Sequence, residues 1–465
     1  MFFLQQLLFE ERYRMTRTLT RMIAGYVAAT DTRALPPKIV ERTAKIITDE
    51  LAGAYFCRRS APAQLAARFA LSMGGPPEAL VLSAGCRAPA AYAALANGTA
   101  GHGEEVDGAH VVGGHPGASI VQAAMCMAER QCATGADLIG AVALGYEVGT
   151  RLVAACGGKF RIRDDHHMTS DFLYAYGCAA AACSLLGLDE TRICHAFALV
   201  SFQTNGLYAL YSEERHISKS FCNGQFAFAG ISAALMAASG LEGNADIFGA
   251  PDGLLAAWGD EGCGDAMLDG LGTQHAVTGA NFKFFNAGYP IHTPVEATLH
   301  LLAEHGLHAD DLSRIEVGMP ENAMRVVDNR KMHSICVQDM LAATIAKGGL
   351  RLSDRPFPAI LADPRFQALR AMIEVKIDPE LNAENPNGRG ARVTLHSRDG
   401  RRVSHRVDSP KGHSRTGDIS WHDLREKWQG NLVDCDSDGL IDLGQRLASL
   451  DDIGQLSKHL CGVMA

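Results

Sequence analysis

The chain has 465 residues, of which 47% are hydrophobic and 20% are charged, and its formal net charge is −9. Single cores rarely exceed a few hundred residues, so this length predicts two domains of a globular protein. The negative charge argues against nucleic acid as a partner, because binding to the phosphate backbone requires clustered lysine and arginine. A small anionic substrate stays open, since a pocket needs only two or three local cations.

Targeting and membrane signals are weak. The N-terminal stretch MFFLQQLLFEERYRM is interrupted by Gln5 and Gln6 and lacks a small-residue cleavage site, so we expect no signal peptide, and Met15 is a candidate natural start. No apolar run reaches roughly 18 residues, so we expect no membrane partner. Thirteen cysteines without a Cys-x-x-Cys pair indicate free thiols in a reducing cytoplasm.

Residues 15–275 show the periodicity of successive helices. Residues 135–156 (GADLIGAVALGYEVGTRLVAAC) place Ala141, Gly145 and Gly149 four apart, a ridge of small residues that predicts close packing of a second helix in the core. Residues 174–188 and 224–241 are almost entirely apolar, which is typical of central helices.

The pattern changes after residue 275. Residues 314–320, 372–378, 391–397 and 401–407 alternate apolar and polar side chains as strands do, and Asp399-Gly400 between the last two predicts a hairpin. Helical segments lie between them. The sequence therefore predicts a mainly α protein with an all-helical domain over 15–275 and 415–465, and an α+β domain with an antiparallel sheet over 276–414.

The segment GHGEEVDGAHVVGGHPG, residues 101–117, concentrates three carboxylates and three histidines between glycines. A catalytic zinc ion would take about three of these side chains: His102, His110 and His115 with Glu104, Glu105 or Asp107. The His-Glu-x-x-His spacing is absent, however. A solvated polar loop and a proton-transfer site, in which carboxylates orient a histidine base, are the other two interpretations.

Other polar groups occur at helix starts. His166 and His167 precede the N-cap candidates Thr169 and Ser170, which would place both imidazoles at a positive helix end that suits an anion; decoration of a capping loop is the alternative. Lys219 opens an apolar helix, where an isolated lysine is usually solvated.

A last group follows at the domain junction. Lys283, Tyr289 and His292 lie there, and ligand clefts are common between domains.

Taken in order, several segments resemble the MmgE/PrpD family, which includes 2-methylcitrate dehydratase, cis-aconitate decarboxylase and iminodisuccinate epimerase. They are AKIITDELAG, AALANGTAGHGEEVDGAH with the following HPG, GADLIGAVALGYEVGTRL, CAAAACSLLGLD, FAFAGISAALMAASGLEG after Lys219, KFFNAGYPIH and SPKGH. The resemblance implies a large helical domain completed by the C-terminal tail, a smaller α+β domain, a homodimer, and neither a metal nor an organic cofactor.

The resemblance also implies site residues. His115, His167, Lys219, Lys283 and His292 match functional positions of the family.

The chain departs from the family in three places. The usual Asp-x-Asp-Asp-Thr-His is here Glu105-Val106-Asp107-Gly108-Ala109-His110, Asn286-Ala287-Gly288 replaces Pro-x-Cys or Pro-x-His, and a usual tyrosine is missing from the segment with Ser334, Cys336 and Val337.

These observations predict proton abstraction next to a carboxylate of a small di- or tricarboxylate. The predicted catalytic residues are His115, His167, Lys219, Asp107 and Tyr289, and the predicted substrate-binding residues are Glu105, His110, Lys283 and His292. Loss of several acidic groups favours an iminodisuccinate-type epimerase with His115 and His167, or Tyr289, as two bases. A 2-methylcitrate-type dehydratase, a cis-aconitate-type decarboxylase and a catalytically inactive binding protein are the alternatives.

Overall fold

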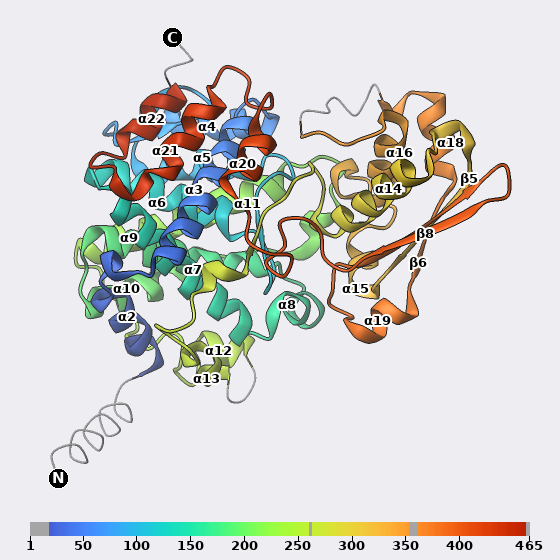
Figure 1. Ribbon diagram of the computed structural model, residues 1–465. Coiled ribbons are helices and arrows are strands. Elements are labelled where there is room, and N and C mark those ends of the chain that lie inside the picture. The colour runs from blue at the N-terminus through green and yellow to red at the C-terminus, as the bar shows by residue number, and fades with distance from the viewer. Residues whose placement is uncertain (1–17, 260–262, 353–359, 462–465) are drawn as a thin grey trace.

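The computed structural model describes residues 18–259, 263–352 and 360–461 and contains two domains (Figure 1). The predictions about the signal peptide and about Met15 lie outside the described residues. The helices of the larger domain are α2 (Leu19–Ala29), α3 (Pro37–Cys57), α4 (Ala61–Ser72), α5 (Ala90–Gly101), α6 (Pro116–Gln131), α7 (Gly135–Ala155), α8 (Gly158–His166), α9 (Tyr174–Leu186), α10 (Glu190–Val200), α11 (Ser218–Ala238), α12 (Leu254–Trp258) and α13 (Cys263–Leu268).

Close packing of small residues builds the centre of this domain. A Cβ at Gly145 of α7 would lie 2.9 Å from the carbonyl oxygen of Gly177 in α9, and one at Gly98 of α5 would lie 2.8 Å from the Cα of Gly224 in α11. Only glycine permits these helix approaches. For Gly145, the predicted packing of the small-residue ridge is confirmed.

In the part of the chain that the structure describes, two helices, α7 and α11, are long and apolar enough to cross a membrane. Within the most apolar 18-residue windows of these helices, 89% and 56% of the residues are buried inside the protein. Both helices pack against α9, which is the environment of core helices.

The C-terminal segment returns to the helical domain (Figure 1). Its helices are α20 (Trp421–Trp428), α21 (Ser437–Gln445) and α22 (Gly454–Cys461). The indole nitrogen of Trp428 donates to Asp49 of α3 at 2.7 Å, and the ammonium group of Lys427 lies 2.7 Å from the same carboxylate. Leu424, Leu440 and Leu456 join the core of the larger domain.

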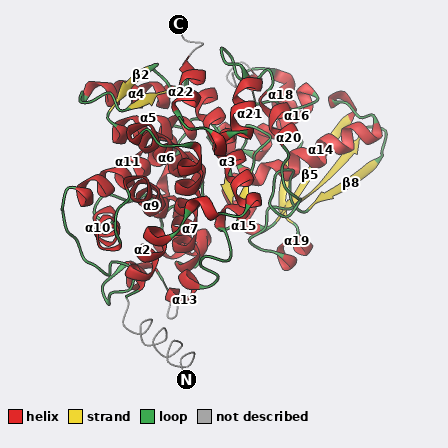
Figure 2. Ribbon diagram, turned by 60° about the vertical axis from the view of Figure 1, so that its left-hand side comes forward, coloured by secondary structure: helices red, strands yellow, loops and turns green. Residues whose placement is uncertain are grey.

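The smaller domain has its own core around a four-stranded sheet, shown in yellow at the right of Figure 2. Its elements are α14 (His292–His305), β5 (Leu312–Met319), α15 (Glu321–Val327), α16 (Val337–Lys347), α18 (Pro364–Ala371), β6 (Ile373–Ile377), α19 (Pro379–Glu384), β7 (Ala391–Ser397) and β8 (Arg402–Val407). All four predicted strands are present, and Gly400, with φ of 90°, lies in the turn of the predicted β7–β8 hairpin.

The sheet is mixed rather than wholly antiparallel, because β5 and β6 run parallel in the order β6-β5-β7-β8. The long connection through α15, α16 and α18 returns the chain to the starting end of β5, which permits parallel pairing. This corrects the prediction of an antiparallel sheet.

Short strands complete the larger domain. They are β1 (Ala79–Val81), β2 (Cys86–Ala88), β3 (Ala109–His110) and β4 (Ala280–Asn281). β3 pairs antiparallel with β4, which joins the 101–117 segment to the domain junction.

Candidate active site

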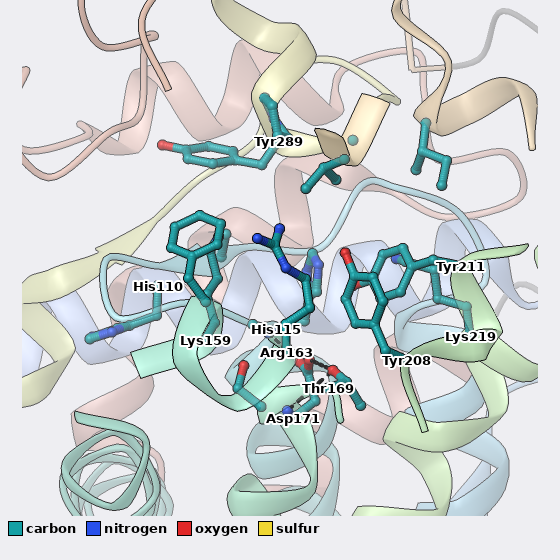
Figure 3. A pocket seen from close by; sticks show the side chains of 18 of the residues that line it. His110, His115, Lys159, Arg163, Thr169, Asp171, Tyr208, Tyr211, Lys219 and Tyr289 are labelled. Carbon is teal, nitrogen blue, oxygen red and sulfur yellow. Dashed lines mark hydrogen bonds between the residues drawn. The ribbon is translucent and has the colours of Figure 1, made fainter. Parts of the chain in front are cut away.

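A pocket lies between the two domains (Figure 3). The helical domain lines it with Glu105, Ala109, His110, Gly114, His115, Lys159, Phe160, Arg163, Met168, Thr169, Ser170, Asp171, Tyr208, Tyr211 and Lys219, and the α+β region with Gly288, Tyr289, Pro290, Val326, Ile335 and Arg389. In Figure 3, Tyr289 lies across the pocket from Thr169 and Asp171. A ligand here would contact both domains.

The local backbone structure brings the polar groups together on one wall of the pocket. α5 ends at Gly101, so His102 follows the helix, and His115 is the N-cap of α6, whose first residue is Pro116. The backbone N–H of His115 donates to Asp171 at 2.6 Å. The pairing of β3 with β4 brings Lys283, two residues beyond β4, beside the same segment.

One carboxylate orients two histidines. Asp107 Oδ2 lies 2.8 Å from His102 Nδ1 and 3.0 Å from His115 Nδ1, and the two imidazole centroids are 4.3 Å apart. His115 Nδ1 is also 3.1 Å from the carbonyl oxygen of Gly108. Because Nδ1 faces these acceptors, Nε2 of His115 is the ring nitrogen that can exchange a proton with a bound molecule.

The second carboxylate bridges two lysines. Glu105 Oε1 accepts from Lys219 Nζ at 2.5 Å, and Oε2 accepts from Lys283 Nζ at 2.9 Å. Lys219 also contacts His102 Nε2, and His216 Nε2 lies 3.0 Å from Glu105 Oε1. Lys219 is therefore buried within the network rather than solvated, although it lies at the start of α11 as predicted.

Electrostatics keeps this network charged. Burial opposes ionisation of Glu105, but Lys219 and Lys283 outweigh it and hold the pKa of that carboxyl well below its usual range. Burial is likewise outweighed at Asp107, whose pKa is lowered by His102 and Lys283. Burial alone would lower the pKa of Lys283, yet the two carboxylates raise it. Burial lowers the pKa of His102 well below its ordinary value. Asp107 opposes this shift and Lys219 adds to it, and the His102 imidazole is neutral as a result.

Two of the three departures from the family pattern have structural counterparts. The longer side chain of Glu105 reaches both lysines, and its backbone N–H donates to Asn286 Oδ1 at 3.1 Å. A Cβ at Gly108 would lie 2.9 Å from Glu50 Oε1, which instead accepts the Gly108 N–H at 2.9 Å. Burial, with Asp107 as the next cause, raises the pKa of Glu50 well above its ordinary value. A carboxyl group from α3 thus lies beside Gly108, the position where the family has its third aspartate.

His167 is placed differently from the expectation. It is the C-cap of α8, with φ of 57°, its side chain is exposed, and it does not belong to the pocket lining among the described residues. We expected His167 to lie at the positive N-terminal end of a helix. That N-terminal end belongs to a short 3-10 helix, which begins after Thr169. The reason is that RIRDDH forms a helix of its own, which ends at the histidines.

Two further predicted residues have structural contacts. His292 is fully buried outside the pocket lining, with Nε2 3.2 Å from the carbonyl oxygen of Ala287, and burial lowers its pKa to about 3 with Lys283 adding to the effect. His110 lines the pocket, but its Nε2 lies 2.8 Å from the carbonyl oxygen of Ala276, and burial lowers its pKa to about 4. Both imidazoles are neutral and held by backbone contacts.

Tyr289 lines the pocket as the junction prediction suggested, and burial raises the pKa of its hydroxyl. Sequence reasoning missed His216, and it considered His102 only as a metal ligand. It also missed Lys159 and Arg389. His216 lies three residues before Lys219, just ahead of α11, and this short spacing was the local signal available.

Metal-ligand geometry exists within the cluster. The ligand atoms of His102, Asp107 and His115 lie within 4.8 Å of one another, as do those of His102, Glu105 and His216. Lys219 Nζ contacts both His102 and Glu105, so a positive charge already occupies the region where a cation would bind. The donor set therefore fits a lysine-balanced proton-transfer network better than a metal site, and absence of a metal remains a prediction.

The fold and this site define a two-domain, mainly helical enzyme with a buried acid–base network facing an interdomain pocket. The family model for the MmgE/PrpD N-terminal domain matches residues 21–262, and the model for the MmgE/PrpD C-terminal domain matches residues 285–438. The chain belongs to the MmgE/PrpD family.

Two curated relatives are similar to it. Cis-aconitate decarboxylase of Homo sapiens is 24% identical over 478 residues, which cover 96% of this chain and 95% of that protein. 2-Methylcitrate dehydratase of Cupriavidus necator is 31% identical over 163 residues, which cover 32% of this chain and 34% of that protein.

Proposed function

We propose that the protein is a lyase that acts, by proton transfer and without a cofactor, next to a carboxylate of a small di- or tricarboxylate. The observation that carries this proposal is the pair of contacts from Asp107 Oδ2 to His102 and His115, which fixes His115 at the pocket. An oriented imidazole of this kind can act as a general acid or a general base. The negative charge that develops on the substrate would lie close to Lys219, a preorganised cation.

Decarboxylation is the reaction that we favour. In it, the carbon–carbon bond breaks, its electron pair stays on the substrate carbon as CO₂ leaves, and protonated His115 delivers one proton to that carbon. One acid suffices for this step. The similarity to cis-aconitate decarboxylase extends over almost the whole chain, which supports the same choice.

Dehydration is the second candidate, because the partial similarity to 2-methylcitrate dehydratase is also to a family lyase. His115 would remove the proton next to the carboxylate, the carbon–oxygen bond would break, and the leaving hydroxyl would take a proton from Lys219. This route needs His115 as the base and Lys219 as the acid in the same reaction.

The epimerase interpretation loses support for a geometric reason. Its two bases were His115 with His167 or Tyr289. His167 is exposed outside the pocket, and the raised pKa of Tyr289 makes it a poor base.

The test uses cis-aconitate and 2-methylcitrate with the purified protein in deuterated buffer, followed by NMR and by CO₂ release. Loss of CO₂ with one deuterium incorporated supports decarboxylation, and loss of water supports dehydration. Exchange of a hydrogen next to a carboxylate of either compound without loss of CO₂ or water would refute the lyase proposal. His115→Gln should abolish turnover, whereas His422→Gln, at an exposed helix position, should not.

Cytoplasmic location and the homodimer stay predictions. Light scattering on the purified protein tests the second of them.

A further inference from the structure

Three cations surround one aromatic ring in the part of the pocket away from the Glu105 network. The Nζ of Lys159 and the guanidinium carbons of Arg163 and Arg389 lie 5.0, 5.0 and 5.1 Å from the centroid of Phe160. The ring face attracts each cation, but it cannot cancel their mutual repulsion. Arg389 comes from the segment before β7, whereas the other two belong to α8, so the group spans both domains.

Among the described residues, Arg163 is the one cation of the three with a carboxylate partner of its own. Arg163 binds Asp164 through two hydrogen bonds of 2.7 and 2.8 Å. Arg389 is buried, and its guanidinium donates hydrogen bonds to the backbone carbonyls of Asn387 and Gly388. Within the described ranges, neither Lys159 nor Arg389 forms an ion pair.

The nearby hydroxyl of Tyr289 adds an independent observation. Its Oη is buried and has no hydrogen-bond partner among the described residues. Tyr289 lines the same pocket as Lys159 and Arg389, and it also lines the adjoining cavity with both of them. Leaving a buried hydroxyl unpaired is costly, so a ligand acceptor is the missing element.

The charge balance of the pocket points in the same direction. Its charged lining residues are the cations Lys159, Arg163, Lys219 and Arg389 and the carboxylates Glu105 and Asp171. Glu105 is already bound to two lysines, and Asp171 is occupied by the His115 N–H and the Thr169 hydroxyl. The basic side chains without a carboxylate partner therefore lie on the Phe160 side, where burial and the neighbouring Arg389 lower the pKa of Lys159 well below its ordinary value. A bound carboxylate would oppose this effect by favouring the protonated ammonium group.

We propose that Lys159, Arg389 and the Tyr289 hydroxyl form a subsite for a non-reacting carboxylate of the substrate. This inference rests on the proposed function, because only that function makes the bound molecule a substrate. Arginine and lysine would meet the charge of the carboxylate, and the neutral phenol would donate a hydrogen bond. The subsite makes a molecule with at least two carboxylates the preferred ligand, because the reacting end is bound near His115.

The test measures equilibrium binding, which does not depend on turnover. Calorimetry with tricarballylate, a saturated tricarboxylate, is compared with butyrate, which has one carboxylate. We expect Lys159→Gln and Arg389→Gln each to weaken tricarballylate binding at least tenfold and butyrate binding less than twofold. Tyr289→Phe should weaken tricarballylate binding by a smaller factor, and Arg389→Lys should restore part of the loss.

Matched controls are Lys331→Gln and Arg401→Gln, which remove exposed cations outside the pocket. Both should bind tricarballylate as the parent does. Folded Lys159→Gln and Arg389→Gln proteins, judged by circular dichroism, that retain parental tricarballylate affinity would overturn the subsite. Equal loss for butyrate would also overturn it.

The two proposals fail in different ways. A protein that converts no carboxylate but loses tricarballylate binding in Arg389→Gln refutes the lyase and supports the anion subsite. A protein that loses turnover in His115→Gln while Arg389→Gln retains the parental KM and affinity supports the lyase and refutes the subsite.

Discussion

Asp107→Asn tests whether one buried carboxylate organises the site. The substitution keeps the size of the side chain but removes the charge that holds two imidazoles at 2.8 and 3.0 Å. A hydrogen bond to a charged group contributes about 1.5–3 kcal/mol, and each factor of ten in rate corresponds to about 1.36 kcal/mol. The His115 contact alone therefore accounts for roughly a 10- to 150-fold loss in kcat.

Tautomer control adds to this loss. An asparagine amide can donate as well as accept, so it can reverse the orientation of the His115 ring and turn the wrong nitrogen toward the substrate. In serine proteases the corresponding aspartate-to-asparagine change costs about 10⁴ in kcat. We therefore expect kcat to fall by about 10²- to 10⁴-fold, while KM changes by less than about threefold because Asp107 is not part of the pocket lining.

The assay is steady-state kinetics on whichever substrate the NMR test identifies, with unfolding in denaturant measured in parallel. Asp339→Asn is the matched control, because Asp339 is also buried and accepts from a histidine, His333, at 2.7 Å in the other domain. It should lower stability and leave kcat unchanged. If Asp107→Asn retains kcat within threefold while His115→Gln is inactive, the orienting role of Asp107 is wrong.

Three further outcomes are expected. The folded pKa of Glu105 is depressed, so its stabilisation is present above its unfolded value of about 4.3 and is lost as pH falls toward the folded value; denaturant unfolding of Glu105→Gln should show a weaker loss of stability in acid than the parent. Gly117→Ala should lower the free energy of unfolding by about 1–3 kcal/mol, because its Cβ would lie 2.1 Å from Glu50 Oε1, whereas Gly264→Ala, with 3.5 Å to its nearest neighbour, should have little effect. Dialysis against a chelator should leave turnover within twofold of the parent, and loss of activity that zinc restores would contradict the lysine-balanced site.

Local patterns were sufficient for most of the fold. The alternating runs that became β5, β6, β7 and β8 carry their own periodicity, and Asp399-Gly400 specifies the hairpin turn. The parallel pairing of β5 with β6 was missed because strand direction depends on the path of the connection rather than on the residues within either strand.

The site was predictable in composition but not in its contacts. Glu105 lies 114 residues from Lys219 and 178 from Lys283 along the chain, so no local spacing could show that one carboxylate binds both. The same separation explains why Lys219 was first interpreted as solvated. Thr169 is an N-cap as predicted, but the residues before it form α8, and His167 therefore lies at the C-terminal end of that helix.

The altered family motif changes meaning once these contacts are known. Gly108 and Ala109 suggested loss of acidic groups, yet Gly108 admits the buried carboxyl of Glu50, and Glu105 alone occupies both lysines. Burial and the nearby Asp107 charge raise the pKa of Glu50 well above its ordinary value, so a carboxyl group from a different helix lies beside the histidine pair. The altered motif is therefore weak support for an inactive protein, and the choice between reactions depends on the substrate groups that face His115 and Lys219.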